Sequence, residues 1–405
     1  MEKKIFHIDM DSYFATCEQQ ANPFLRGKPI AISGHPDSRT VVSAASKEAK
    51  WFGVKSAMAI HEARRFCPEI IFIPGDFDKY IYITKKIINI FLSFTEQVEV
   101  TSIDEAFVDV TPIAKRHGGE INVANKIKSE LKKQVGDWMT CSIGIAPNKL
   151  IAKLISDFKK PDGIMQVRKK DIPSILETIK LTDFCGLGRQ TEKHLNRMGI
   201  NSVTELQQFP LEKLVKEFGE IGLQLHNMSR GRGSDYVPSY YDESQEKSMG
   251  HQITLPKNTM DLEYLSNTLL KLCEKTSRRM REAKLVGRVI TVSIRHSNFE
   301  GFSRQKAVNF YTNDGYQIFK IARNILKTFP LDSPVRLIGV SISQLTTSDQ
   351  SQLPFSDNQK RKAILKAMDT VNDRHGEFTI KRASLLKELN LKRDIPGHGL
   401  MRKFK

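Results

Sequence analysis

The sequence has few of the residues that build disulfide frameworks, sulfur-ligated metal sites or membrane spans. Its five cysteines (17, 67, 141, 185 and 273) lie far apart and form no Cys-x-x-Cys pair, so neither a disulfide framework nor a zinc site is predicted. The longest apolar stretch, Tyr80 to Phe94, is interrupted by two lysines and is too short to cross a bilayer. The chain opens on a strand pattern without a charged-then-apolar leader. We therefore expect a reduced, soluble, cytoplasmic protein.

Positive charge, in contrast, is abundant. The 405 residues include 63 lysines and arginines against 46 aspartates and glutamates, which gives a net charge of +17. Such an excess makes a polyanion the expected partner, although a basic ribosome-associated or membrane-surface protein would also fit. The length is enough for about two to four domains with ample core.

Against this basic background, acidic residues occur in two segments that otherwise have the pattern of buried strands. Asp9 and Asp11 follow the first apolar strand, and Asp104 and Glu105 lie within a run of β-formers, 98–110. Divalent metal would explain them, because Mg²⁺ binds carboxylates together with substrate phosphates. Adjacent strand residues point to opposite faces, so we expect one acid of the second pair at a strand end or bulge. The alternative is that Asp104 and Glu105 are two surface acids on an edge strand. This pair alone does not distinguish a metal site from such surface acids.

Between the two acidic segments lies a smaller set of elements. Residues 28–33 and 40–44 are β-rich and joined by a turn cluster, which suggests a hairpin. A helix is predicted from 45 to 52, and its Lys47 and Lys50 are three residues apart and share one face. These lysines could bind phosphate or form a solvated stripe.

The order of elements around the acids predicts the fold of the first domain. An amphipathic helix, 78–94, precedes the acidic strand, and a further helix, 120–135, a small-residue strand, 141–146, and a helix, 150–157, follow it. This order predicts a ferredoxin-like domain with a subdomain inserted after its first strand.

Residues 170–232 have an all-helical pattern and contain a more specific signal. Gly186 and Gly188 precede a helix predicted at 191–198. A helix, a Gly-x-Gly hairpin and a second helix can present backbone N–H groups to a DNA phosphate without reading bases. Further helices are expected at 211–218 and 221–229.

After a polar stretch, 233–246, with the character of an interdomain linker, a second β-α-β-β-α-β pattern occupies 247–345. A sheet that is apolar on one face and basic on the other could lie along a nucleic-acid backbone, and plain solubility is the alternative. The basic side chains predicted for the polar faces are Arg288, Arg295, Arg304 and Lys306.

Together these features resemble the Y-family, or translesion, DNA polymerases, and most closely their bacterial DNA polymerase IV (DinB) branch. The resemblance covers about residues 3–345 and rests on several motifs of this chain. They are I-D-M-D-S-Y-F, S-I-D-E-A-F, G-I-A-P-N-K-L-I-A-K, K-K-P-D-G, G-L-G before a helix, G-H-Q-I-T-L-P and R-L-I-G-V-S-I-S.

The resemblance implies an α+β, multidomain fold. It consists of a ferredoxin-like palm with inserted fingers, an all-helical thumb with a helix-hairpin-helix, and a second ferredoxin-like little finger. The implied limits are palm 1–12 and 78–168, fingers 13–77, thumb 169–232, linker 233–246, little finger 247–345 and a tail, 346–405.

Site residues are implied in the same way. Asp9, Asp104 and Glu105 would bind two Mg²⁺ ions, assisted by the Met10 carbonyl, with Asp11 beside the site. Phe14, next to Tyr13, falls where the family keeps the steric-gate aromatic that collides with a ribonucleotide 2′-OH. Lys160 matches the lysine that contacts the incoming triphosphate. Ser102 and Lys149 belong to the same motif neighbourhood.

One departure from the family pattern concerns Lys47 and Lys50, which stand where the family usually has a Tyr and an Arg. Lysine still offers donors to phosphate, but as a point charge without the arginine fork. We therefore expect catalysis to survive and nucleotide affinity or selectivity to differ.

The implied activity is template-directed addition of dNTPs to a primer 3′-OH by two-metal phosphoryl transfer, with low fidelity and no proofreading. Small residues near the site, Ser43 and Ala44 among them, suggest a roomy pocket that tolerates damaged templates. The expected partners are primer–template DNA and dNTPs, with no membrane, and the chain is expected to be a monomer.

The tail carries a motif of its own. Gln350, Leu353 and Phe355 resemble the short peptide by which bacterial polymerases dock on the sliding clamp, and a chance match in a polar segment is the alternative. Residues 358–370 form a basic helical stretch.

Three other functions remain open on the sequence. A two-metal nuclease would also cluster carboxylates, but it would not need an aromatic gate or triphosphate lysines. A nucleotide cyclase would leave the helix-hairpin-helix and the second basic sheet unexplained. A non-catalytic DNA-binding scaffold would tolerate loss of an acid, and the chain keeps all three.

Overall fold

The computed structural model describes residues 2–34, 39–242, 246–347 and 356–385. These residues divide into two compact units, and the boundary between them in the sequence follows Asp242. Each unit has its own hydrophobic core and is described separately below.

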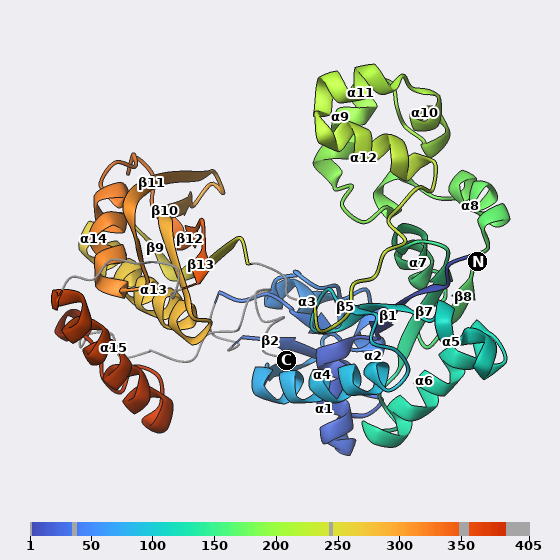
Figure 1. Ribbon diagram of the computed structural model, residues 1–405, viewed down its shortest axis with the longest axis horizontal. Coiled ribbons are helices and arrows are strands. Elements are labelled where there is room, and N and C mark those ends of the chain that lie inside the picture. Colours follow the sequence, from blue (N-terminus) through green and yellow to red (C-terminus); the bar gives the residue numbers. More distant parts are fainter. Residues whose placement is uncertain (1, 35–38, 243–245, 348–355, 386–405) are drawn as a thin grey trace. The chain divides into compact units, whose positions relative to one another are not determined.

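A five-stranded sheet, the palm sheet, lies at the centre of the first unit (Figure 1). Its central strand is β1, which pairs antiparallel with β6 on one side and with β7 on the other. The outer strand β5 pairs antiparallel with β6, and β8 pairs parallel with β7. The strands are β1 Ile5–Met10, β5 Val98–Val100, β6 Glu105–Asp109, β7 Cys141–Ala146 and β8 Ile164–Gln166, in the order β5-β6-β1-β7-β8.

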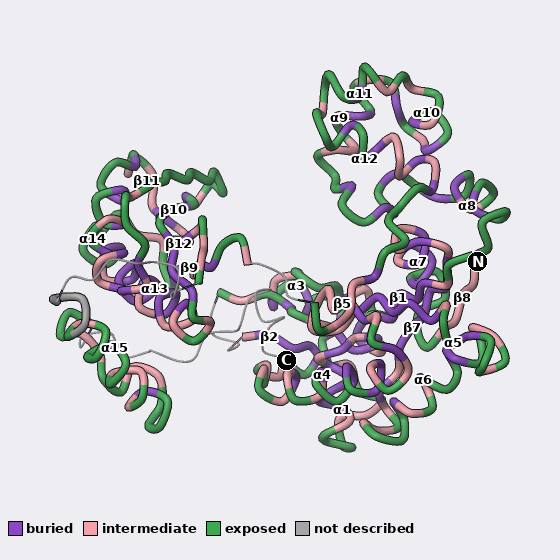
Figure 2. The backbone as a smooth tube through the Cα atoms, in the orientation of Figure 1, coloured by how far each residue is buried: buried purple, intermediate pink, exposed green. Residues whose placement is uncertain are grey.

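Helices cover both faces of this sheet, which explains why its central strands are apolar on both sides. Phe6, Ile8 and Met10 of β1 pack into the core formed with α1 (Tyr13–Ala21), α4 (Phe77–Leu92) and α6 (Glu120–Gln134). Ile5 and Phe107 face the opposite side, where α7 (Lys149–Ser156) supplies Ile151 and Ile155. Figure 2 shows β7 as a buried segment and β1 as buried except at Asp9, which is half-buried. The short elements α5 (Thr111–Ala114) and η2 (Lys115–His117) connect β6 to α6.

The β-forming run at 98–110 is not one strand. Residues 101–104 form a turn between β5 and β6, in which the N–H groups of Thr101 and Ser102 donate to the carbonyl of Glu105. The expectation that one acid of the pair would lie at a strand end is confirmed, because Asp104 precedes β6 and Glu105 opens it.

The inserted subdomain contains a small sheet in the order β3-β2-β4. The predicted hairpin exists, but its second strand is only β3 (Ala44–Ala45), and β4 (Ile71–Pro74) adds in parallel to β2 (Ile30–Ser33). The predicted helix at 45–52 is shorter, because the Ser46 side chain caps α2 (Lys47–Trp51) by accepting from the N–H of Ala49. The remaining elements are η1 Pro23–Leu25 and α3 Ile60–Phe66.

The helical region follows β8 through η3 (Lys169–Asp171), α8 (Ile172–Thr178) and η4 (Leu181–Asp183). One helix was not predicted. Ser202 and Glu205 form a capping box that begins it, and this S-x-x-E pattern is a signal that the sequence carries. The four helices that follow η4 are α9 Arg189–Arg197, α10 Val203–Gln208, α11 Leu211–Phe218 and α12 Glu220–Ser229.

The first part of the expected linker packs on the first unit. The carbonyl of Ser234 accepts from the N–H of Lys149, and the N–H of Tyr240 donates to the carbonyl of Glu96. Val237 is buried in the same core as α7. Residues 233–242 are therefore attached to the palm sheet and its helices by main-chain bonds and an apolar anchor.

The second unit has the predicted β-α-β-β-α-β order. Its sheet runs β11-β10-β12-β9, all antiparallel, with α13 and α14 packed on one face through the apolar side chains of β10 and β12. The elements are β9 Ser248–Thr259, α13 Leu262–Glu282, β10 Leu285–His296, β11 Gly301–Thr312, α14 Gly315–Leu326 and β12 Val335–Ser343, with β13 Thr346–Thr347 pairing with β10.

The register of this sheet corrects one expectation, that the four basic side chains would share a polar face. Arg304 lies opposite Val292 and Lys306 opposite Ile290, so both lie on the helix-covered side of the edge strand β11. The Arg304 guanidinium accordingly donates to the carbonyl of Thr328. Arg295, opposite Gly301, belongs to the other face. Alternation along β11 alone does not show which of its sides is polar, because that depends on the register with β10.

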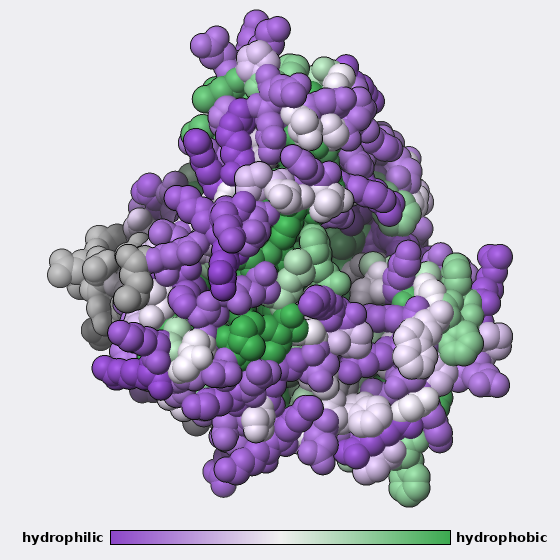
Figure 3. All heavy atoms as spheres, turned by 90° about the vertical axis from the view of Figure 1, so that its right-hand side faces the viewer, coloured by the Kyte–Doolittle hydropathy of each residue, from purple (hydrophilic) through white to green (hydrophobic). Residues whose placement is uncertain are grey.

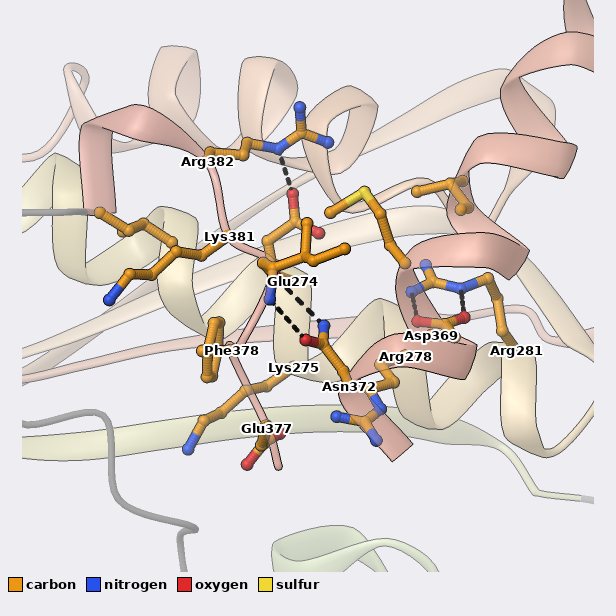
Figure 4. A pocket seen from close by; sticks show the side chains of 14 residues that line it. Glu274, Lys275, Arg278, Arg281, Asp369, Asn372, Glu377, Phe378, Lys381 and Arg382 are labelled. Carbon is orange, nitrogen blue, oxygen red and sulfur yellow. Dashed lines mark hydrogen bonds and ion pairs between the residues drawn. The ribbon is translucent and has the colours of Figure 1, made fainter. Parts of the chain in front are cut away.

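The described part of the tail packs against α13. Its elements are α15 (Ser356–His375) and η5 (Ala383–Leu385), and Leu385 is fully buried in the core of the second unit. Arg281 forms two hydrogen bonds, of 2.6 and 2.7 Å, with Asp369. Figure 4 shows this pair and the bond between Arg382 and Glu274. The predicted basic helix at 358–370 thus exists and forms an additional layer on the second unit.

On the face shown in Figure 3, hydrophilic side chains cover most of the surface and hydrophobic ones gather in separate patches. Within the described ranges, no helix combines the length and apolar character needed to cross a membrane.

Candidate nucleotide-binding site

The two acidic segments meet at one end of the palm sheet. Asp9 is the penultimate residue of β1 and lies opposite Glu105 in the β1–β6 register. The N–H of Met10 donates to the carbonyl of Asp104 across 2.9 Å, which ties the turn before β6 to the end of β1. Ser102 donates to the Asp104 carboxylate within the same turn.

Asp9 is paired with a lysine. Its carboxylate lies 2.8 Å from the ammonium of Lys160, which also lies 2.6 Å from Asp157. Burial raises the pKa of Asp9, Lys160 opposes the rise, and the negative charge of Asp104 adds to it. Burial alone would lower the pKa of Lys160, but the two carboxylates outweigh it and raise that pKa.

Glu105, on the same face of the sheet, is also paired with a lysine, here one from α7. Its carboxylate accepts from Lys153 across 2.6 Å and from Thr101 across 3.0 Å, and it lies 3.4 Å from Nε2 of His7. Burial would raise the pKa of Glu105, but the bonds from His7 and Lys153 prevail and lower it to about 2. His7 is held from its other nitrogen by Ser156, 2.8 Å away.

Asp11 has a different setting from the other acids. It is buried, and its carboxylate accepts three hydrogen bonds of 2.8 Å, from the hydroxyls of Thr140 and Ser142 and from the N–H of Asp162. With its oxygens used in this way, Asp11 connects β1, β7 and the turn after Lys160. Asp11 also lines the same pocket as Asp9 and Asp104.

The two lysines of α2 face the acids. The ammonium of Lys47 donates to the hydroxyl of Thr140 across 2.8 Å. Burial and the positive charge of Lys160 lower the pKa of Lys50, while Asp11 and Asp9 act in the opposite direction. Both lysines line the same pocket as Asp9 and Asp104, with Lys47 half-buried and Lys50 exposed.

Phe14 is held by other aromatic rings. It stacks on Tyr80, with centroids 4.6 Å apart and planes at 17°, and its edge contact with Phe77 spans 5.5 Å. The neighbouring Tyr13 is buried, and its hydroxyl lies 2.7 Å from that of Thr84, which donates to the carbonyl of Ile103. The ring beside the site is thus fixed by packing and linked to the acidic turn.

These side chains line a common pocket of about 410 Å³ between the palm sheet and the inserted subdomain. It collects three acids, three lysines and the fixed aromatic ring, and small residues border it. The lining residues are Asp9, Met10, Asp11, Ser12, Tyr13, Phe14, Ser43, Ala44, Ala45, Lys47, Lys50, Trp51, Ser56, Asp104, Lys160 and Pro161.

The donor set suits a hard divalent cation only in part. Among the described residues, no three His, Cys, Asp or Glu side chains gather closely enough to hold a metal ion. Asp9 and Asp104 nevertheless offer oxygen to the same pocket, and Mg²⁺ needs only one or two protein carboxylates when substrate phosphates complete its shell. Glu105 would bind the same cation only after its bond to Lys153 is broken.

Sequence reasoning missed Lys153, His7 and Trp51. Lys153 is the last residue of the G-I-A-P-N-K-L-I-A-K motif, four positions after Lys149 and so on the same face of α7. Lys149 itself pairs with Glu99, 2.7 Å away, and does not line the pocket. His7 could have been found from the strand period, because it lies two residues before Asp9 and points to the same side.

Other predicted residues lie away from this pocket. Gly186 has φ +92°, and Gly188 is the N-cap of α9; a side chain at either would meet open space. The basic residues of β10 and β11 belong to the second unit. The clamp-peptide residues Gln350, Leu353 and Phe355 lie outside the described residues.

Three parts of the chain match known families. Residues 8–157 match the impB/mucB/samB family, and residues 246–355 match the C-terminal domain of that family. Residues 182–233 match the thumb domain described as that of DNA polymerase-iota.

Curated relatives are similar along nearly the whole chain. The DNA polymerase IV of Moorella thermoacetica is 37% identical over 94% of this chain and 95% of its own length. That of Pelotomaculum thermopropionicum is 34% identical over 98% of this chain and 99% of its own. The Listeria innocua protein of the same name is 36% identical over 85% of this chain, and 95% of its own length is covered.

Solved structures agree. A Y-family DNA polymerase chimera of Dbh and Dpo4 has a TM-score of 0.75 and 27% identity, covering 85% of this chain and 99% of the chimera. DinB from Sulfolobus solfataricus has a TM-score of 0.54 and 28% identity, with 84% and 98% covered. The fold is therefore the multidomain α+β fold of palm, fingers, thumb and little finger. The chain belongs to the Y-family of translesion DNA polymerases, among the homologues of DNA polymerase IV, and is a DNA-directed DNA polymerase.

Proposed function

We propose that the pocket binds the incoming deoxynucleoside triphosphate and that Asp9, Asp104 and Glu105 form the catalytic centre that joins it to a primer 3′-OH. One observation carries this proposal: Asp9 and Asp104 share a single pocket with three lysines and a fixed aromatic ring. Carboxylates suit divalent metal, ammonium groups suit a triphosphate, and the ring suits a sugar.

Two Mg²⁺ ions are the cofactor that this donor set would hold, through Asp9, Asp104 and the main-chain carbonyl of Met10. Bound there, the ions would lower the pKa of the primer hydroxyl and neutralise charge on the leaving pyrophosphate. Glu105 contributes a carboxylate that is already ionised, because its low pKa keeps it charged at every physiological pH.

The lysines receive the triphosphate. Lys160 holds Asp9 at 2.8 Å and can transfer this charge pairing to a phosphate oxygen. Among the described residues, the partner of the Lys47 ammonium is a neutral hydroxyl, that of Thr140, so an anionic oxygen would be a stronger acceptor. A phosphate beside Lys50 would offset the burial and the Lys160 charge that lower its pKa.

Phe14 selects the sugar. Since Tyr80 and Phe77 contact its ring from different directions, the ring cannot easily move away from an added 2′-OH. On the fingers side, Ser43 and Ala44 line the pocket with small side chains. A pocket bounded by small residues leaves room for altered template bases, which accords with translesion synthesis and with low fidelity.

DNA would be bound at places outside this pocket. The backbone around Gly186 and Gly188 is open to a phosphate, and the second unit would contribute the basic residues Arg288, Arg295, Arg304 and Lys306. Since the register puts Arg304 and Lys306 on the helix-covered side of β11 and Arg295 on the other face, Arg295 would contact DNA that lies across the open face of the sheet.

The domain limits also remain as proposed from the sequence: palm 1–12 and 78–168, fingers 13–77, thumb 169–232, linker 233–246, little finger 247–345 and tail 346–405. Residues 350–355 would bind the sliding clamp, on the strength of the sequence motif alone. The chain would act as a monomer on DNA in the cytoplasm.

Primer extension tests this function. The substrate is duplex DNA with a 5′ template overhang, with Mg²⁺ and dNTPs, with undamaged and abasic-site templates side by side. We expect wild type to extend both, and Asp104→Asn to lower the rate roughly 100- to 1,000-fold because charge compensation in the transition state is lost. Phe14→Ala should admit ribonucleotides.

Glu99→Gln is the matched control, since Glu99 lies on β5 of the same sheet, is paired with Lys149 and does not line the pocket. It should retain near wild-type extension. Extension by Asp104→Asn at the wild-type rate would contradict the site assignment. Shortening of the primer would point to a nuclease, and tight DNA binding without extension to a scaffold.

A further inference from the structure

Trp51, the last residue of α2, is a large aromatic side chain that the site has not yet used. Trp51 is 83% exposed, yet it lines the pocket together with Lys47 and Lys50 of the same helix. Among the described residues its indole has neither a ring-stacking nor a hydrogen-bonding partner. An unpartnered indole at a pocket is costly to hydrate and favourable to cover, so it is a candidate contact for the pocket's ligand.

The other aromatic residues near the pocket are satisfied by the protein itself. Phe14 stacks on Tyr80, and Tyr13 is buried with its hydroxyl bonded. Trp138, the only other tryptophan of the chain, donates from Nε1 to Gln19 across 3.0 Å and lies under the Arg26 guanidinium. Trp51 thus differs from its aromatic neighbours in offering its ring to whatever enters the pocket.

The surroundings of Trp51 indicate the chemistry of that ligand. Lys47 is four residues before Trp51 and Lys50 is adjacent, so the helix presents cations and an aromatic surface together. A ligand that combines a polyanion with a flat ring satisfies both, and a nucleoside triphosphate is such a ligand. We propose that Trp51 is a nucleotide-binding residue, whose indole packs against the incoming nucleoside triphosphate while the lysines take its phosphates.

This inference rests on the proposed function and deepens it, because it assigns substrate affinity to a residue that does not act in the chemical step. Removing a base–aromatic contact weakens binding by an amount that corresponds to about tenfold. Trp51→Ala should therefore raise KM for dNTP about tenfold and leave kcat within about twofold. Trp51→Phe, which keeps a ring, should restore most of the affinity.

Phe24 provides a matched control. It is also 83% exposed, but it lies on η1 and does not line the pocket. Phe24→Ala should leave KM unchanged. If Trp51→Ala lowers kcat without raising KM, or if Phe24→Ala raises KM equally, the inference is wrong.

The decisive measurement uses fluorescence and does not depend on turnover. In the Trp138→Phe enzyme, Trp51 is the sole tryptophan, and its exposure predicts emission typical of a solvated indole. With a primer lacking its 3′-OH, Mg²⁺ and a titration of complementary dNTP, we expect a saturable change in emission. A change on adding DNA alone, with none on adding dNTP, would assign Trp51 to the template strand and overturn the inference.

The role of Trp51 and the proposed function can be refuted separately. If the Trp138→Phe enzyme extends primers but its tryptophan emission does not change on addition of dNTP, the assignment of Trp51 is wrong and the proposed function stands. If wild type extends no primer, the proposed function fails whatever the fluorescence does.

Discussion

The ion pair between Lys153 and Glu105 should contribute stability that depends on pH in a defined way. A folded-state pKa of about 2 for Glu105, against an ordinary 4.5, corresponds to roughly 3 kcal/mol in favour of the folded state when the carboxylate is charged. The Glu105 side chain is 18% exposed, so solvent screening removes little of this. Because His7 shares the carboxylate, Lys153→Met should cost roughly 1–2 kcal/mol of unfolding free energy at pH 7.

The sign of the pH effect follows from the lowered pKa. The charged carboxylate stabilises the fold fully above pH 4.5, and this contribution is lost as the pH falls from 4.5 towards 2. The difference between wild type and Lys153→Met should therefore be constant from pH 8 to about 5 and shrink below 4.5. Urea denaturation at several pH values measures it, with Trp138 reporting on the first unit in a Trp51→Phe background.

Lys149→Met is the matched control, because it removes the same charge from the same helix. Its partner Glu99 is 30% exposed, so the cost should stay below about 1 kcal/mol. The reasoning is refuted if Lys153→Met costs no more than Lys149→Met at pH 7, or if its cost is the same at pH 3 as at pH 7.

Further predictions concern other parts of the chain. Asp11→Ala should destabilise the protein by about 2–4 kcal/mol in the same denaturation assay, since removal of the buried carboxylate leaves three hydrogen-bond donors without an acceptor. An unchanged urea midpoint would contradict the role assigned to Asp11. A double-mutant cycle between Arg281 and Asp369 should give a coupling of about 1–2 kcal/mol, because the pair is bidentate and its side chains are only 16% and 21% exposed; additive losses would show that the tail contributes nothing there. Gly186→Ala should weaken DNA binding and cost about 1 kcal/mol, because its φ of +92° disfavours a side chain; unaltered DNA affinity in a binding titration would remove the hairpin from the proposed interface.

Residue patterns predicted the architecture well where the physical signal was local. The apolar period predicted α11 at its observed limits, and the β-α-β-β-α-β order of the second unit followed from alternation and turns. The β-forming run at 98–110 was wrong as a single strand, because the turn at 101–104 depends on bonds to the carbonyl of Glu105 that no propensity shows.

The sequence predicted which residues form the site, but not which side chains pair with one another. Asp9 and Asp104 could be placed together, since each lies at the end of a strand of one sheet. That Lys153 would hold Glu105 depends on α7 packing across β1 and β6, which the sequence spacing does not reveal. The face occupied by Arg304 and Lys306 was missed for a similar reason, because it depends on the register between β10 and β11.

The pairing of Asp9 with Lys160 has a consequence for the order in which the site fills. One ammonium group cannot neutralise a carboxylate and a triphosphate fully at the same time. If a nucleotide draws Lys160 to its phosphates, as we propose, the Asp9 carboxylate would lose this counter-ion and would be available to bind a cation. Without nucleotide, Lys160 thus neutralises Asp9. Under this proposal, binding of the nucleotide and binding of the cation would each favour the other.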